Sequence, residues 1–226
     1  MSDHSEPTLV GPLTRDALRT PRAAAVAGIA FALLLFTVLF LVRLAIPPHA
    51  EDAGEWLTDR RRRDAALLAL NLVPFAGIAF LWFIGVVRDR IGAGEDRLFA
   101  TVFLGSGLLF IAMLFAGGAV AGGLMLAEEG QRSVGVWSFG RRMTHSLFHV
   151  YAMRMAAVFT ISTTTIASRL GLAPRWLSVL GLGTGLILML AVGFFPWVEL
   201  LFPTWVLVLS LHMLAVSYRT APPTVV

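Results

Sequence analysis

Three residues that ionise or form strong hydrogen bonds lie close together in one apolar stretch. The segment RRMTHSLFHVYAMRMAAVFTIS, from Arg141 to Ser162, contains His145, His149 and Arg154. A helix turns by about 100° per residue, so His145 and His149 share one face and Arg154 lies nearly opposite. Ionisable residues within a membrane-spanning helix mark sites for ligands, ions or protons. This segment is therefore the first place to look for chemistry.

Other polar residues are expected at similar depths in neighbouring apolar segments. Counting along segments that run in the same direction places Asn71 level with His149, His212 level with Arg154, and Glu199 near His145. The sequence therefore predicts one polar patch that extends from one end of a helix bundle to its middle. Its members are Asn71, His145, His149, Arg154, Glu199 and His212.

Three interpretations of this patch stay open. The groups are structural, with the histidines at a helix interface and Arg154 bonded to carbonyls and hydroxyls. Alternatively, they line a path or site for a small molecule, a lipid or a proton, since histidine titrates near neutral pH. In the third interpretation, His145 or His149 pairs with His212 to ligate a metal or haem. The HxxxH spacing lacks a third ligand, so no cofactor is predicted and metal or haem remains the alternative.

Enzyme signatures are missing from the sequence. It has no HExxH, GxSxG, P-loop or GxGxxG motif, and no pair of carboxylates within an apolar segment. Cysteine is absent, which excludes disulfides, thiolate metal ligands and cysteine nucleophiles. A non-catalytic role is therefore expected, either as a partner-binding subunit or as a binding or transport protein.

The elements that must position these residues are apolar helices. The chain has 226 residues, of which 57% are hydrophobic and only 14% charged, against roughly 25% charged in soluble domains. The apolar residues form blocks that reach the ~20 residues needed to cross a bilayer. The sequence predicts an all-α bundle of six transmembrane spans, at about 23–46, 65–87, 98–126, 145–168, 176–195 and 199–217.

The flanks of these spans suggest a multi-pass protein of the cell membrane. Residues 1–22 form a polar N-terminal tail and 220–226 a short C-terminal tail, and Pro196 and Pro203 separate the last two spans. Arginines are nearly balanced between the two sides, but the basic flank before the first span favours cytoplasmic termini. All 18 basic residues are arginines and, apart from Arg154, they flank apolar blocks, so nucleic acid is not an expected partner.

Small residues in two spans indicate close helix packing. Gly118 and Gly122 form a GxxxG pattern in the third span, and Gly181 and Gly185 repeat it in the fifth. Small residues one turn apart let two helix backbones approach closely in lipid. They are expected to pack the bundle itself, with a homo-oligomer or another membrane protein as the alternative contact. The lipid bilayer is the partner expected in either case.

The stretch RDRIGAGEDRLFATVFLGSGLLFIAMLFAGGAVAGG, from Arg88 to Gly123, supports one resemblance. It resembles multi-pass membrane proteins of unknown function from high-GC bacteria of actinobacterial type, over roughly the second to fourth spans. The resemblance implies a helical membrane fold and carries over no activity or site residue.

Overall fold

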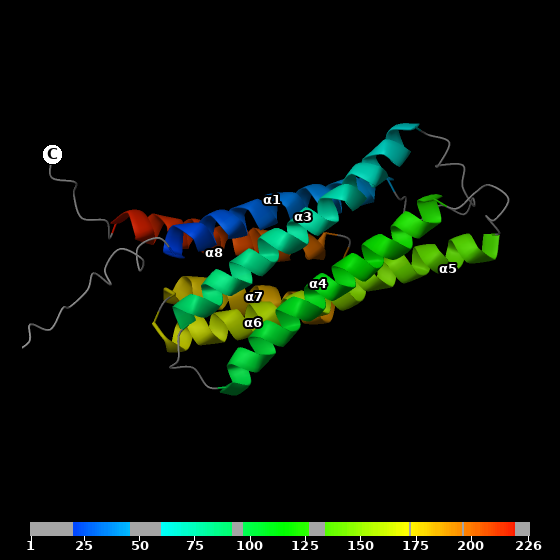
Figure 1. The fold of residues 1–226 in the computed structure, drawn as a ribbon. Coiled ribbons are helices and arrows are strands. Elements are labelled where there is room, and N and C mark those ends of the chain that lie inside the picture. Colours follow the sequence, from blue (N-terminus) through cyan, green and yellow to red (C-terminus); the bar gives the residue numbers. More distant parts are fainter. Residues whose placement is uncertain are drawn as a thin grey trace, which may run out of the picture.

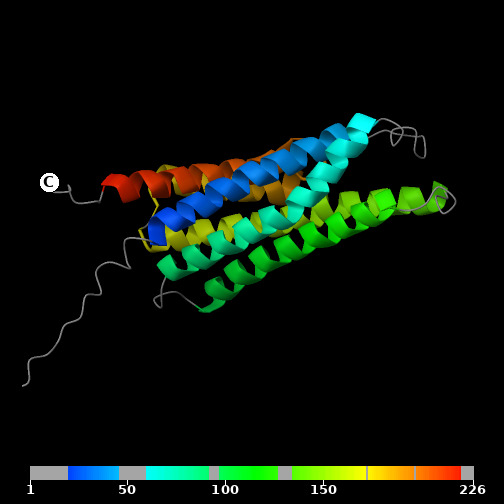
Figure 2. The ribbon, with the colours of Figure 1, turned by 45° about the horizontal axis from the view of Figure 1, so that its top comes forward.

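A computed structural model describes residues 20–45, 60–91, 97–126, 134–171, 173–195 and 197–219. Every long element in these ranges is a helix, as the sequence predicts, and no strand occurs in them. The long helices lie roughly side by side along one direction (Figures 1 and 2). The elements are α1 (Thr20–Ala45), α3 (Arg60–Ile91), α4 (Arg97–Leu126), α5 (Val134–His145), the π-helical turn η3 (Ser146–Ala152), α6 (Met153–Arg169), α7 (Arg175–Ala191), the 3-10 turn η4 (Val198–Leu200) and α8 (Leu201–Arg219).

Five helical segments within these ranges are long and apolar enough to cross a membrane. They comprise residues 23–43, 60–89, 98–126, 135–169 and 198–218. The remaining apolar helix, α7, has only 17 residues, or about 25 Å at the usual helical rise. Six predicted spans therefore correspond to five long helical segments and one short helix. The predicted tails lie outside the described residues, apart from the start of α1.

Two helices differ in length from the spans predicted on them. The helix that contains the predicted span at about 145–168 begins at Val134, because Trp137 and Gly140 of α5 pack against the end of α4 and continue the helix past Arg141 and Arg142. The fifth helix ends at Ala191 instead of about residue 195, and Gly193 follows with a φ of 95°. A positive φ ends a helix and suits glycine, which has no Cβ.

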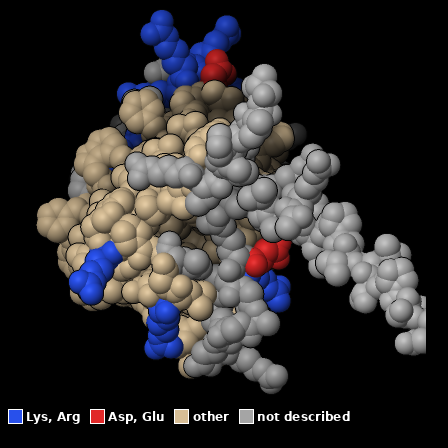
Figure 3. All heavy atoms as spheres, turned by 90° about the vertical axis from the view of Figure 1, so that its left-hand side faces the viewer, with Lys and Arg blue, Asp and Glu red and all other residues tan. Residues whose placement is uncertain are grey.

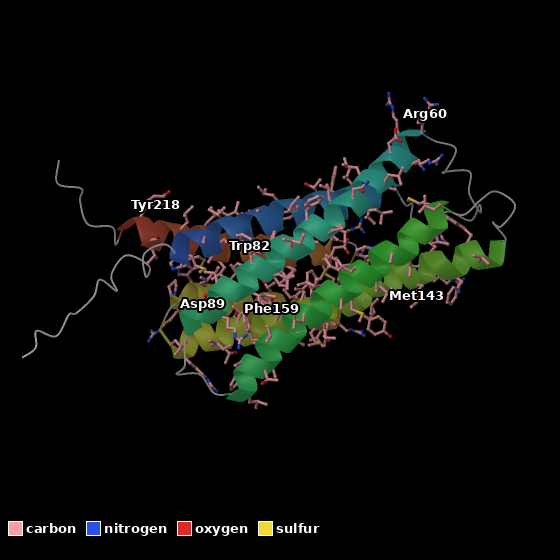
Figure 4. All side chains as sticks on the ribbon, viewed as in Figure 1. Arg60, Trp82, Asp89, Met143, Phe159 and Tyr218 are labelled. Carbon is pink, nitrogen blue, oxygen red and sulfur yellow. The ribbon has the colours of Figure 1, made fainter. Side chains whose placement is uncertain are left out.

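Phenylalanines from five helices form the centre of the bundle. Each of the rings touches several others at centroid distances of 4.4 to 6.3 Å. Truncation of a buried phenylalanine to alanine typically lowers the stability of a fold by roughly 3–5 kcal/mol. The members are Phe31 (α1), Phe80 (α3), Phe110 (α4), Phe159 (α6) and Phe202 (α8), and Figure 4 marks Phe159 among the packed side chains.

Helix α7 joins the bundle differently, through glycines. A Cβ at Gly181 would meet Thr164 Oγ1 of α6 and would lie 2.7 Å from Trp205 Nε1 of α8. A Cβ at Gly185 would lie 3.2 Å from the carbonyl oxygen of Ala157. These glycines therefore let α7 approach α6 closely, in the way that small residues serve helices in lipid.

The outer surface between the charged ends is mostly apolar. Viewed from the end that carries Asp89 and Tyr218, the described surface is mostly uncharged, with arginines and a few acidic side chains around it (Figure 3). Leucine, phenylalanine and tryptophan side chains are widely exposed; Trp82 of α3, for example, is 69% exposed. The combination of an apolar belt and charged ends is what a bilayer selects.

Candidate functional site

A buried carboxylate is the central feature of the site. Glu199 lies in the 3-10 turn η4, at the start of the helical segment that continues into α8, and only 7% of the residue is exposed. Pro203 follows in the first turn of α8. Backbone N–H groups there have no acceptor within the helix, so the N–H that proline lacks costs no hydrogen bond. The short turn thus delivers an acidic side chain into the bundle immediately before a membrane-length helix begins.

Two side chains from other helices bind this carboxylate. Arg43 Nη1, in the last turn of α1, donates to Glu199 Oε1 at 3.1 Å. His149 Nδ1, in the π-helical turn, makes a short hydrogen bond to Glu199 Oε2. Burying an ionised carboxylate is costly unless partners of this kind compensate it. Glu199 therefore joins three parts of the chain that are far apart in sequence.

Two aromatic side chains complete the arrangement. The rings of His145 and His149 lie 4.7 Å apart, with 41° between their planes. The guanidinium of Arg43 lies 4.4 Å from the centre of the Trp197 ring, a cation–π distance. We call Arg43, His145, His149, Trp197 and Glu199 the Glu199 cluster.

The Glu199 cluster is open to the surface on its basic side. The carboxylate side chain is 8% exposed, whereas the Arg43 and His149 side chains are 29% and 23% exposed. His145 is exposed. The two histidines therefore lie at the surface of the bundle and not in its packed core.

Hydrogen bonding fixes what His149 does chemically. An ionised Glu199 is an acceptor only, so His149 Nδ1 must carry the hydrogen that it donates. In the neutral ring, Nε2 is then the nitrogen that remains available to accept a proton. An added proton turns the contact between a neutral imidazole and a carboxylate into an ion pair, which adds Coulombic attraction to the hydrogen bond.

Three residues of the predicted polar patch lie elsewhere. Asn71 is exposed on α3, and its Nδ2 donates to the carbonyl of Leu67 at 2.9 Å. Arg154 is exposed on α6. His212 of α8 has its ring 5.9 Å from that of Trp176 of α7. The structure thus brings together His145, His149 and Glu199 from the predicted patch.

Arg43 and Trp197 were not among the site residues predicted from the sequence. Both had a usable signal: Arg43 ends the first span, and the Trp197–Glu199 stretch begins the last one, so a six-span path puts them on the same side. Oppositely charged residues at adjacent span ends are natural partners.

The structure also bears on the metal alternative and on the packing expected at Gly118 and Gly122. Within the described ranges, no group of three or more histidine, cysteine or acidic side chains is arranged to hold a metal ion. A Cβ at Gly118 would make an ordinary contact 3.5 Å from Val73, and one at Gly122 would meet open space. The tightly packed glycines of α4 are Gly107, where a Cβ would lie 2.7 Å from Ile84, and Gly117, where a Cβ would lie 2.8 Å from the Phe148 ring.

No protein-family model, curated protein or solved structure matches this chain. The function is therefore argued from the geometry of the Glu199 cluster.

Proposed function

We propose that the chain is a six-span integral membrane protein of the cell membrane that binds an exchangeable proton at the Glu199 cluster. In this proposal α7 is the short fifth span and both termini are cytoplasmic. The protein is a non-catalytic membrane component, and the histidines beside Glu199 are its binding groups. The observation that carries the proposal is the buried Glu199 carboxylate held between Arg43 and His149.

The composition of the cluster favours proton binding over a purely structural ion pair. Arg43 alone would compensate the charge of Glu199. The cluster adds His149 on the second carboxylate oxygen and His145 with its ring close to that of His149, both partly accessible. Two imidazoles this close disfavour a double positive charge, so the pair is suited to binding one proton.

The position of the cluster along the bundle suits uptake from one side of a membrane. His149 lies twenty residues before Arg169, which corresponds to roughly 30 Å of helix and to the thickness of the hydrocarbon core. With Arg169 at the cytoplasmic boundary, His149 lies at the opposite boundary. The proton is then exchanged with the non-cytoplasmic side.

Nitrogen NMR of histidine-labelled protein in lipid nanodiscs tests the proposal. The chain has five histidines, and single His→Gln variants assign their signals. Spectra are recorded from about pH 5 to pH 8, and we expect Nε2 of His149 to gain a proton toward the acidic end while Nδ1 keeps its hydrogen. We expect Glu199→Gln to change this titration and His212→Gln to leave it unchanged. A His149 signal that stays constant over this range would overturn the proposal.

A partner-binding role is the second candidate, and one end of α4 favours it. A Cβ at Gly122 or Gly123 would meet open space, and Leu126 beside them is 81% exposed. An unoccupied small-residue face on an apolar helix is suited to contact with another helix. This role and proton binding at the Glu199 cluster are compatible, because they use different parts of the molecule.

A further inference from the structure

The histidine that binds Glu199 lies within a π-helical turn. His149 is the fourth of the seven residues Ser146–Ala152, which interrupt the long helix formed by α5 and α6. A π-helical turn contains one residue more than the α-helix it interrupts, and such turns are frequent at functional sites. The segment SLFHVYA contains no proline or glycine, so its local sequence also allows an ordinary α-helix.

Contacts outside the helix favour the π form. Phe148 fits beside Gly117 of α4, where even a methyl group would lie 2.8 Å from the ring. His149, the next residue, is held by Glu199. Two contacts therefore favour the π turn: Phe148 fits beside Gly117 of α4, and His149 hydrogen-bonds to Glu199 of η4.

Only the second of these contacts depends on a proton. Among the described residues, Arg43 of α1, Glu199 of η4 and Arg141 of α5 are charged groups near the two histidines. Helix α4 contributes Gly117, which has no side chain. A proton on His149 converts its bond to Glu199 into an ion pair, whereas loss of that proton leaves a neutral imidazole on the carboxylate, without the Coulombic attraction.

We infer that η3 is a proton-controlled switch, in which the protonated Glu199 cluster holds the π turn and deprotonation lets it relax to an α-helix. When the π turn becomes α-helical, the additional residue joins α5. Helix α5 then rotates about its own axis, relative to α6, by up to about 100°. Helix α5 packs on the end of α4 through Trp137, so the turn moves that end of the molecule. This inference rests on the proposed proton binding, and it adds a rotation of α5 as the consequence of that binding.

Spin-label distance measurements test the switch directly. The chain has no cysteine, so two introduced cysteines are labelled specifically. Phe139→Cys on α5 and Val179→Cys on α7 replace side chains that are 70% and 71% exposed. A turn of about 100° at a helix radius of about 5–6 Å moves the first label by roughly 8 Å. The control pair, Leu33→Cys with Val179→Cys, does not cross η3.

We expect one distance at about pH 5 and a second population, displaced by several ångströms, at about pH 8, where histidine is neutral. The control pair should not change. Glu199→Gln should abolish the pH dependence, because its amide cannot form the ion pair. Deletion of Ser146, which removes the additional residue, should give one distance at both pH values.

A second variant keeps the test decisive if the deletion does not fold. Gly117→Ala places a methyl group against Phe148, so it should shift the wild-type populations toward the relaxed distance at both pH values. Distances that are the same at both pH values, in a protein whose His149 titrates by NMR, would overturn the switch and leave proton binding in place. A His149 that does not titrate would overturn the proposed function itself.

Discussion

Removing the Glu199 carboxylate tests whether the cluster holds the bundle together. Glu199→Ala deletes the acceptor of two hydrogen bonds, from Arg43 and from His149. Charge-assisted bonds contribute about 1.5–3 kcal/mol each in water-soluble proteins, but polar contacts between membrane helices average nearer 0.6 kcal/mol. Both partners are partly exposed and recover some solvation, so about 1 kcal/mol for each bond is a reasonable value. The expected loss is about 2 kcal/mol, or roughly thirtyfold in the folding equilibrium.

The assay is unfolding in mixed micelles, followed by tryptophan fluorescence as the denaturing detergent is raised. Glu199→Gln keeps one carbonyl acceptor and should lose about half as much stability, near 1 kcal/mol. His212→Gln is the matched control, since His212 contacts Trp176 outside the cluster, and it should change stability by less than about 0.5 kcal/mol. If Glu199→Ala changed stability no more than this control, the carboxylate would not be stabilising the fold.

Three further predictions concern packing. Gly181→Val should destabilise the protein by about 1–3 kcal/mol in the same unfolding assay, because its Cβ meets Thr164 and Trp205; unchanged stability would contradict the close approach of α7. Phe159→Ala should cost about 3–5 kcal/mol, since the ring is fully buried among other phenylalanines; a loss below about 1 kcal/mol would place the core elsewhere. Gly122→Cys should form a disulfide-linked dimer in native membranes if α4 self-associates, whereas monomer alone would refute that contact.

Helix composition and length made most of the fold predictable. The segment at 98–126 was predicted within one residue of α4, because a continuous apolar block leaves little choice of structure. The start of α5 was not predictable in this way. Arg141 and Arg142 resemble the end of a span, and only the contacts of Trp137 and Gly140 with α4 explain why the helix continues through them.

The site was partly predictable for a related reason. Helical periodicity placed Arg154 opposite the histidines, and in the structure Arg154 is exposed while His149 contacts Glu199. Counting residues along each helix predicted the depth of a side chain in the bundle, but not the face of the helix on which it lies. Asn71 was therefore grouped with His149, although it lies on the exposed side of α3. The π turn also departs from the regular periodicity on which such counting relies.

The central claim is that His149 donates a hydrogen from Nδ1 to an ionised Glu199, leaving Nε2 free to bind a proton. Solid-state NMR of the protein in lipid bilayers measures this contact directly, from the carboxyl carbon of Glu199 to Nδ1 of His149. The account predicts a separation of about 3–4 Å, with hydrogen on Nδ1, at neutral pH. A separation beyond about 6 Å, or an Nδ1 without hydrogen, would contradict it.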